Sequence, residues 1–478
     1  MKRVYLILMG ALSLSAPLAI PAANDLPELG DVSATVLSPL DEQRIADQIM
    51  RDVMTSNQVV QDVEISDYVQ NLGYRLAASG PDKRQPFKFF VVRDNSINAF
   101  AMPGGVIGVH TGLILAANSE SEVAGVLGHE IGHVVQHHMA RMLAQQKRDS
   151  ITTMATMALA ILAARANPQL GGGAMTAASA GAVQKQLDYT REHEREADRV
   201  GLQILDSAGF DTRGMPAFFE TLQKGSRFVE GSAPSFLRTH PLTVERIADV
   251  RSRVEQTPYR QVPDSAEFQY VRAKLLATLG TPRQAVAVFQ GNLQDKKYTS
   301  EAAQHYGLAQ AYMRNNDVNN ASKELAWLRQ NAPHHAMIET LAANIEVARK
   351  NPAEAAKQYT AALNMFPGHR ALIYGYAEHF LATGQADKAL KLIQEKQPMY
   401  PDDPYFYELM SRVYTVQGKS LLRHQAQGEA YFRRYNWQGA LEQMDLAAKA
   451  GDGDFYQQSI VEARLKQMRQ VIMDQPKR

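Results

Sequence analysis

The sequence of 478 residues contains no cysteine. This absence excludes disulfides, thiol nucleophiles, iron–sulfur clusters and thiolate metal sites, so any bound metal must be held by histidines and carboxylates. The chain also lacks an excess of either charge, because 51 Lys and Arg stand against 50 Asp and Glu, a formal net charge of +1. We therefore expect no nucleic acid partner. With 45% hydrophobic residues, the chain can bury a large core and is expected to divide into two or three domains.

Long hydrophobic runs are scarce, and the first lies at the N-terminus. A Met-Lys-Arg head precedes an apolar stretch over residues 4–18, and small residues follow at 22–23. This order predicts a secretory signal peptide over residues 1–23, with an uncleaved membrane anchor as the alternative. A lipoprotein is excluded because no cysteine follows the apolar stretch. Export of a cysteine-free chain predicts a periplasmic protein.

A second apolar run covers residues 151–164, about fourteen residues, and leads to three consecutive glycines at 171–173. Because a bilayer span needs roughly 20 residues, this run predicts no membrane crossing. We expect the protein to be peripheral to a membrane at most. The run is interpreted either as a mobile flap beside the functional site or as a buried core helix.

Hydrophobic spacing in the first half of the chain predicts an α+β fold that is mainly helical. Apolar positions recur at helical spacing over residues 39–54, 68–76, 119–144 and 189–205. Two β-prone runs, 87–92 and 106–109, predict a small sheet between these helices. The segment from Ala101 to His110 is expected either to supply an edge strand that an extended substrate joins or to form an ordinary core hairpin.

The second half of the chain carries a repeat of 34 residues. Three series share this period: Ala287, Ala321, Ala355 and Ala389; Ala309, Ala343 and Ala377; Pro333, Pro367 and Pro401. This is the period of tetratricopeptide repeats, in which small residues let two helices pack closely and a proline ends the second helix. We expect an all-α tetratricopeptide solenoid beyond a boundary between Pro258 and Pro263. An ordinary helical bundle with coincidental spacing is the alternative.

The sequence His129-Glu130-Ile131-Gly132-His133 lies inside the helix predicted over residues 119–144. Residues four apart lie on one face of a helix, so His129 and His133 can bind one zinc ion. Glu130 projects beside them and can take a proton from an attacking water. The alternative is a surface helix whose two histidines share no task.

A catalytic zinc ion usually takes a third protein ligand and keeps one position open. On the helix predicted over residues 189–205, Glu194 and Asp198 lie on one face. Glu194 could bind the metal while Asp198 accepts a hydrogen bond from the far nitrogen of a ligand histidine. On spacing alone, Glu196 and His193 compete with Glu194, and a carboxylate-rich helix is commonly just solvated.

His240 precedes Pro241, which biases it towards an extended conformation in a loop. Three roles stay open for this imidazole: a stabiliser of the transition state, an occupant of the open zinc position, or a local hydrogen-bonding group. As a fourth ligand, His240 would close the site and leave the enzyme latent.

Three segments together resemble the HtpX and CAAX prenyl endopeptidase family of gluzincin metalloproteases. They are residues 98–105 (Asn-Ala-Phe-Ala-Met-Pro-Gly-Gly), 129–133 and 194–201 (Glu-Arg-Glu-Ala-Asp-Arg-Val-Gly). The resemblance covers roughly residues 38–255. It implies that Glu194 is the third ligand, that Asp198 supports a ligand histidine and that Glu196 is a bystander. The chain departs from that family in lacking long transmembrane helices, which argues against membrane-embedded or prenylated substrates.

An exported protease followed by tetratricopeptide repeats is similar to the BepA-like periplasmic proteases that serve outer-membrane protein assembly. The likeness spans nearly the whole mature chain and implies a zinc metalloprotease domain at residues 24–260 and a tetratricopeptide domain at 261–478. It also implies one zinc ion per chain, misfolded or stalled outer-membrane proteins as substrates, and the outer-membrane assembly machinery as a partner of the repeats.

Two other functions compete with this interpretation. The chain could act as a chaperone or adaptor for outer-membrane protein assembly with a latent protease site. A purely structural zinc module ranks last, because Glu130 would then have no task. Other divalent ions could also occupy a site of histidines and carboxylates.

Overall fold

The computed structural model describes residues 37–145, 191–227 and 234–473. The predicted signal peptide and the apolar run at 151–164 lie outside these residues. Among the helices that are described, none combines the length and the apolar character needed to cross a membrane.

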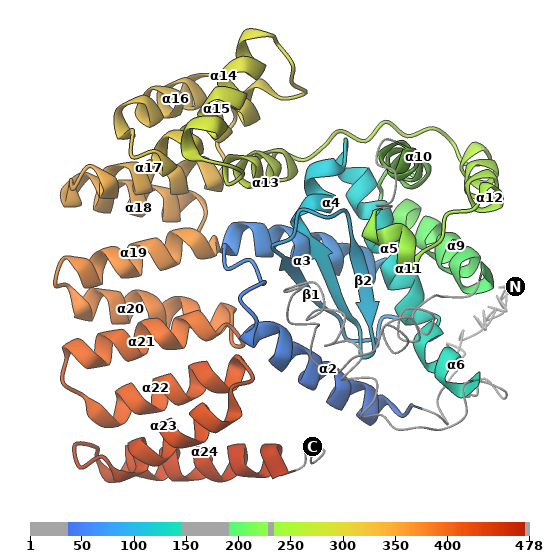
Figure 1. Ribbon diagram of the computed structural model, residues 1–478. Coiled ribbons are helices and arrows are strands. Elements are labelled where there is room, and N and C mark those ends of the chain that lie inside the picture. Colours follow the sequence, from blue (N-terminus) through green and yellow to red (C-terminus); the bar gives the residue numbers. More distant parts are fainter. Residues whose placement is uncertain (1–36, 146–190, 228–233, 474–478) are drawn as a thin grey trace, which may run out of the picture.

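A small sheet lies at the centre of the first half of the chain (Figure 1). Its strands are β1 (Lys88–Val92), β2 (Ala99–Met102) and β3 (Val106–His110), in the order β1-β3-β2. β3 pairs in parallel with β1 and antiparallel with β2. A Cβ at Gly108 would lie 2.4 Å from the Phe100 ring, so glycine is required where the two strands meet.

The prediction of an edge strand from Ala101 to His110 is only half right. β2 is at the edge, but β3 is the central strand of the sheet. Gly104 and Gly105 both adopt positive φ and turn the chain back, which inserts β3 between β1 and β2. Within the segment from Ala101 to His110, β2 is therefore the strand at an edge where another chain can pair.

Nine helices of the first half are described. They are α2 (Pro39–Thr55), α3 (Val63–Ala78), α4 (Thr111–Ala116), α5 (Glu120–Val135), α6 (His138–Gln145), α9 (Arg191–Ser207), α10 (Gly214–Arg227), α11 (Ser235–Thr239) and α12 (Val244–Glu255). Alternating residues of β1 face opposite ways, with Phe89 in the core with α3 and α5 and Phe90 in the core with α2. The helices predicted over 39–54, 68–76 and 189–205 are confirmed as α2, α3 and α9.

The helix predicted over residues 119–144 is wrong as a single element. α5 ends at Val135, and α6 begins at His138. Between them His137 adopts φ 50°, a left-handed conformation that a continuing α-helix does not accommodate. The break leaves the helical motif of 129–133 intact and turns His138 out of the line of α5.

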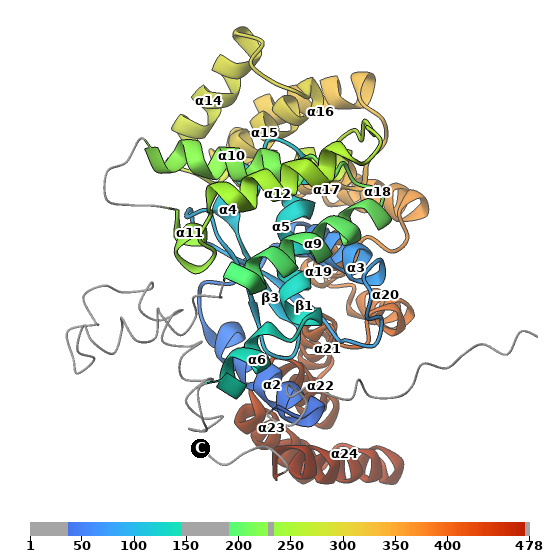
Figure 2. The same ribbon diagram turned by 90° about the vertical axis from the view of Figure 1, so that its right-hand side faces the viewer.

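The second half of the chain is a solenoid of antiparallel helices that runs along one side of the first half (Figures 1 and 2). It comprises α13 (Ala266–Ala277), α14 (Pro282–Gln294), α15 (Glu301–Arg314), α16 (Val318–Asn331), α17 (Ala336–Ala348), α18 (Pro352–Met365), α19 (Arg370–Ala382), α20 (Ala386–Lys396), the short 3-10 helix η2 (Gln397–Met399), α21 (Pro404–Val416), α22 (Ser420–Arg433), α23 (Trp437–Lys449) and α24 (Phe455–Met473).

The alanine series explains the packing of this solenoid except at one position. Ala309, Ala343 and Ala377 are fully buried, as are Ala321, Ala355 and Ala389. Ala287 is exposed, and Ala285, 36 residues before Ala321, is buried in its place. The connection between α14 and α15 covers residues 295–300, two more than the connection at 332–335 between α16 and α17. This longer connection shifts the phase of the first repeat.

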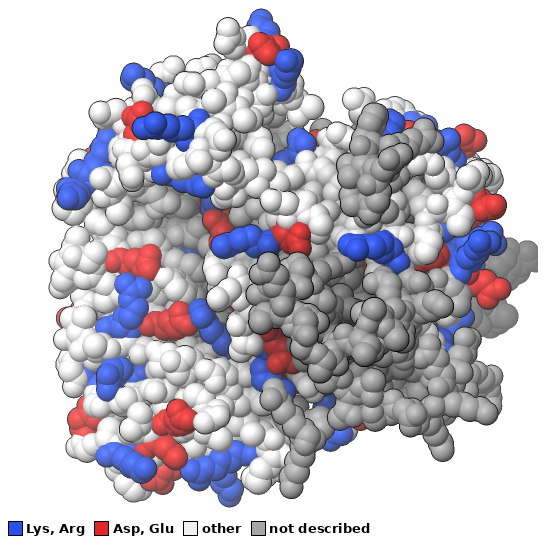
Figure 3. Space-filling view, in the orientation of Figure 1, with Lys and Arg blue, Asp and Glu red and all other residues white. Residues whose placement is uncertain are grey.

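The solenoid shares a continuous core with the first half, because the rings of Tyr68 in α3 and Phe268 in α13 lie 6.1 Å apart within one buried cluster. Its far end also touches the first half, where Lys88 of β1 donates to the Tyr435 hydroxyl at 3.0 Å. On the face shown in Figure 3, acidic and basic side chains are interspersed over the solenoid.

Candidate active site

The site is built where α5 crosses α9. Glycines are required at this crossing. A Cβ at Gly132 would lie 2.8 Å from the carbonyl oxygen of Ala197, and one at Gly201 would lie 2.9 Å from the amide nitrogen of His129. Larger side chains at these positions would push the two helices apart. The close approach brings Glu194 of α9 to the two histidines of α5.

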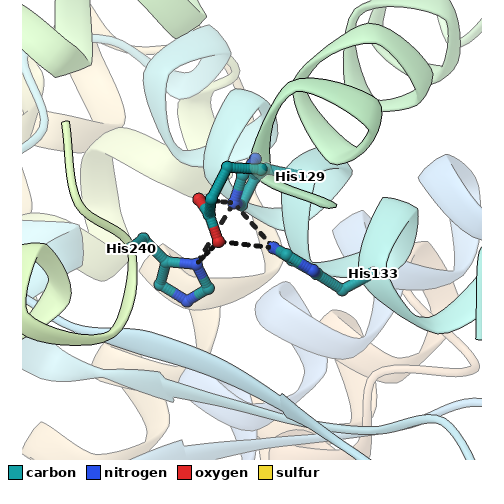
Figure 4. A group of neighbouring side chains, drawn as sticks. His129, His133 and His240 are labelled. Carbon is teal, nitrogen blue, oxygen red and sulfur yellow. Dashed lines mark hydrogen bonds and ion pairs between the residues drawn. The ribbon is translucent and has the colours of Figure 1, made fainter. Parts of the chain in front are cut away.

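Four buried side chains form a group whose nitrogen and oxygen atoms converge: His129, His133, Glu194 and His240 (Figure 4). The Nε2 atoms of His129 and His133 are 3.0 Å apart, and each lies 3.5 Å from a carboxylate oxygen of Glu194. Nδ1 of His240 lies 3.4 Å from His129 Nε2 and 3.1 Å from Glu194 Oε1. We call these four residues the donor group.

The spacing of the donor group fits one metal ion. Ligands at about 2.0–2.1 Å from a tetrahedral zinc ion lie roughly 3.3 Å from one another, and the five separations given above run from 3.0 to 3.5 Å. All four side chains are almost completely buried. Buried imidazoles and a carboxylate at this spacing suit a metal ion such as zinc.

Glu130 lies beside the donor group and is itself fully buried. Its Oε1 lies 3.4 Å from Nε2 of His240, and neither carboxylate oxygen forms a hydrogen bond with a described side chain. Burial raises the pKa of Glu130 above its ordinary value, against the opposing effect of His240 and His129. A buried carboxylate with a raised pKa and unused oxygens is suited to taking up and releasing a proton.

A second set of contacts holds the donor group from behind. Asp198 Oδ1 lies 2.8 Å from Nδ1 of His129, on the side of the ring opposite the donor group. Arg246 donates two hydrogen bonds to Asp198, each 2.8 Å long, and its Nη1 lies 2.7 Å from Glu194. Nη1 of Arg246 also donates to the carbonyl of Pro241 at 2.8 Å, next to His240.

These contacts keep the carboxylates of the site ionised. Burial works to raise the pKa of Glu194, but His240 and His129 lower it well below its ordinary value. For Asp198, His129 and Arg246 likewise outweigh burial and lower the pKa. Two ionised carboxylates against one arginine leave a net negative charge inside the protein, which a cation can neutralise when the histidines are neutral.

All six residues singled out from the sequence meet in this place: His129, Glu130, His133, Glu194, Asp198 and His240. The competitors on α9 point elsewhere. The ring of His193 stacks on His138, with centroids 4.5 Å apart. Glu196 lies 3.1 Å from His138 and 2.9 Å from Arg141, so its carboxylate interacts with these two side chains and not only with solvent.

Sequence reasoning missed Arg246. One pattern could have found it, because Arg246, Val250 and Val254 lie at helical spacing on the buried stripe of α12. An arginine on an apolar stripe needs a buried anionic partner.

Comparison with known proteins places the sequence in a family. The model of peptidase family M48 matches residues 65–254, and a tetratricopeptide repeat model matches residues 346–413. The beta-barrel assembly-enhancing protease of Escherichia coli (strain K12) is 29% identical over 478 residues, 98% of this chain and 97% of the relative. A Vibrio cholerae relative named for the same activity is 33% identical over 463 residues, 96% of each chain.

The chain belongs to this family of M48 proteases. A shorter relative, metalloprotease YcaL of Escherichia coli (strain K12), is 31% identical over 227 residues, 47% of this chain and 85% of that protein. The chain is thus a metalloendopeptidase joined to tetratricopeptide repeats, and the donor group is a buried cluster that could hold a metal ion.

Proposed function

We propose that the chain is a periplasmic zinc endopeptidase that hydrolyses misfolded or stalled outer-membrane proteins during their assembly. One observation carries the enzymatic part, namely a buried donor group with the spacing of metal ligands beside the buried carboxylate of Glu130, which forms no hydrogen bond with a described side chain. His129, His133 and Glu194 are the proposed ligands of one zinc ion per chain. Asp198 is proposed to orient His129.

The proposed chemistry is peptide hydrolysis without a covalent intermediate. The zinc ion would supply a Lewis acid that polarises the scissile carbonyl and makes water more acidic. Glu130 takes a proton from the attacking water and delivers it to the leaving amine. In the metal-free site, burial raises the pKa of Glu130 above its ordinary value. β2 packs on α5 and lies at an edge of the sheet, where an extended substrate can pair with it.

His240 is proposed as a fourth ligand that closes the resting site. Its Nδ1 lies among the other donor atoms at 3.1–3.4 Å. With four protein ligands a zinc site has no open position, so a substrate can enter only after His240 leaves. The adjoining loop is held by the Arg246–Pro241 contact and by the amide of Phe236, which donates to the carbonyl of Ile97.

The proposed domains are a signal peptide at residues 1–23, a metalloprotease domain at 24–260 and a tetratricopeptide domain at 261–478. α12 ends at Glu255 and α13 begins at Ala266, which supports a boundary in the connection between them. The two family models match on opposite sides of this connection.

The cellular setting is proposed from the relatives. Two of them, each matched over nearly their whole length, are named for enhancing beta-barrel assembly. The predicted signal peptide supports export to the periplasm. We propose that the repeats bind substrates or the outer-membrane assembly machinery.

A chaperone or adaptor with a latent protease site is the second candidate. It is favoured by the position of His240 within the donor group, which leaves no open place for a substrate. Binding of client proteins by the repeats could then be the main activity. The two functions are compatible in one chain.

The first test compares the zinc-loaded mature chain with its Glu130→Gln variant on an unfolded outer-membrane protein. We expect the variant to keep one zinc ion and to lose proteolysis by about 10²–10⁴-fold, since the general base is gone. Glu122→Gln is the matched control, because Glu122 is a buried glutamate of the same helix that accepts a hydrogen bond from the amide of Asn118. Equal and measurable proteolysis by the wild type and Glu130→Gln would contradict the proposed mechanism, whereas no proteolysis by either protein with zinc bound would favour the latent site.

Removal of His240 separates a latent site from a chaperone without protease activity. In His240→Ala we expect zinc to remain on three ligands and proteolysis to increase, because a position opens for the substrate. Loss of proteolysis with zinc retained would instead assign His240 to the transition state. Unchanged proteolysis would contradict both roles at the metal.

A further inference from the structure

The two histidines of α5 have different partners on their far sides. Nδ1 of His129 faces Asp198, whereas Nδ1 of His133 lies 2.8 Å from Nδ1 of another buried histidine, His138. We propose that His138 is a positioning residue that holds His133 in the orientation needed for the metal. Glu196 in turn holds His138.

The backbone places His138 there through the break after α5. The left-handed conformation of His137, φ 50°, ends the helix and starts α6 at the next residue. A non-glycine residue in this conformation is uncommon and is kept where the surroundings require it. Here the turn brings the ring of His138 against that of His133, with centroids 4.9 Å apart and planes at 73°.

The hydrogen bonds run consistently in one direction. Nε2 of His133 faces the donor group, so its proton belongs on Nδ1, which donates to Nδ1 of His138. His138 then carries its proton on Nε2 and donates it to Glu196 Oε2 at 3.1 Å. Arg141 donates to the same oxygen at 2.9 Å. The chain of contacts therefore ends on an ion pair at the surface of the protein.

Burial of the histidines restricts the movement of this series of hydrogen-bonded side chains. His138 is fully buried, and its ring stacks on His193 at an interplanar angle of 20°. This series of hydrogen bonds also gives a role to Glu196, which the family resemblance implied to be a bystander. Each histidine of α5 is then oriented from behind by its own set of groups: Asp198 with Arg246 for His129, and His138 with Glu196 for His133.

This inference rests on the proposed zinc site, so the test measures zinc binding itself. His138→Phe keeps an aromatic ring and removes both hydrogen bonds, whereas His138→Gln keeps polar atoms that can replace one of them. We expect zinc to bind about 10–100-fold more weakly to His138→Phe, with an intermediate loss for His138→Gln, because groups behind a ligand histidine contribute this much to affinity. Affinity is measured by competition with a chelating dye.

Two controls separate positioning from folding. The thermal midpoint of the metal-free protein is expected to change little in both variants. His305→Phe in α15 applies the same substitution to a histidine that stacks on Trp327 in the solenoid, and should bind zinc like the wild type. Glu196→Ala is a second variant at a partly exposed side chain, and we expect a smaller loss of affinity.

The outcomes are distinct. Wild-type affinity in His138→Phe would overturn the inference while leaving the zinc site in place. Equal losses in the Phe and Gln variants, with an equal fall of the metal-free thermal midpoint, would show a purely structural role and also overturn it. Failure of the wild type to bind zinc would contradict the proposed site and this inference together.

Discussion

Arg246 joins three separate parts of the site. It is completely buried and contacts Asp198, Glu194 and the carbonyl of Pro241. Its guanidinium can do this because its donors form a rigid planar fork, which a lysine lacks. The residue therefore links the helix of the proposed third ligand to the loop that carries His240.

Replacement of Arg246 should reveal this link. We expect Arg246→Met to lower the free energy of unfolding by about 3–5 kcal/mol, because Asp198 and Glu194 are left as buried carboxylates without their cation. Arg246→Lys keeps the charge and should lose less stability. Urea unfolding of the metal-free protein measures both, and adding Asp198→Asn to Arg246→Met should restore part of the loss. A loss below 1 kcal/mol in Arg246→Met would show that the carboxylates do not depend on it.

The sequence predicts those parts of the site that lie close together along the chain better than those that depend on the packing of distant segments. His129, Glu130 and His133 follow from the geometry of one helix, which spacing alone determines. The choice of Glu194 over Glu196 depends on how α5 and α9 cross, and thus on Gly132 and Gly201. Spacing along α9 carries no information about that crossing, so Glu194 could not be told apart from Glu196 and His193 without the resemblance.

At the scale of elements, α3 makes a central contact between the peptidase part and the solenoid. Glu64 in its first turn is buried, and each of its oxygens has a partner: Lys274 of α13 at 2.6 Å and His369, just before α19, at 3.0 Å. Arg370 pairs with Asp67 one turn further along α3. One helix thus holds two distant parts of the solenoid.

Glu64 should make this contact sensitive to acid. Burial works to raise its pKa, but Lys274 and His369 lower the pKa from 4.5 to about 2. A carboxyl group whose pKa is lower in the folded than in the unfolded state stabilises the fold fully above about pH 4.5. This contribution, roughly 3 kcal/mol, is lost as the pH falls from 4.5 towards 2.

The Glu64→Gln variant measures that contribution. We expect it to be less stable than the wild type at pH 7, with a difference in unfolding free energy that shrinks as the pH falls below 4.5. Denaturant unfolding at pH 7, 5, 4 and 3 gives the comparison. Glu354→Gln in α18, a glutamate near Lys357 on the solenoid surface, is the control. A difference that stays constant across this pH range would contradict the assignment.

Elements were predicted well where periodicity is uninterrupted and poorly where one residue changes the backbone. α2 and α9 follow their apolar spacing closely. The split of α5 from α6 depends on the φ angle of His137. The hydrophobic pattern of the sequence continues past this residue without change and therefore does not show the break. β2 has only four residues and depends on its pairing with β3, so its sequence alone does not mark it as a strand.

At the scale of the whole molecule, the peptidase part and the solenoid share one core. Glu120 accepts hydrogen bonds from the amide and hydroxyl of Ser265, and the amide of Glu120 donates to Asp264. At the other end Arg51 of α2 lies over the ring of Trp437, 4.9 Å from its centroid. The exposed connection at residues 258–263 is therefore not what holds the two parts together.

Cutting that connection should leave the molecule assembled. With a cleavage site for a specific protease inserted after Tyr259, we expect the two halves to elute together in gel filtration after the cut. Proteolytic activity should persist, because all residues of the donor group and Glu130 precede the cut. Phe268→Asp is the matched variant, since it places a charge against Tyr68 in the shared core, and its halves should separate. Separation of the halves without that substitution would show that the covalent connection, rather than the packing of α3 on α13, keeps the solenoid in place.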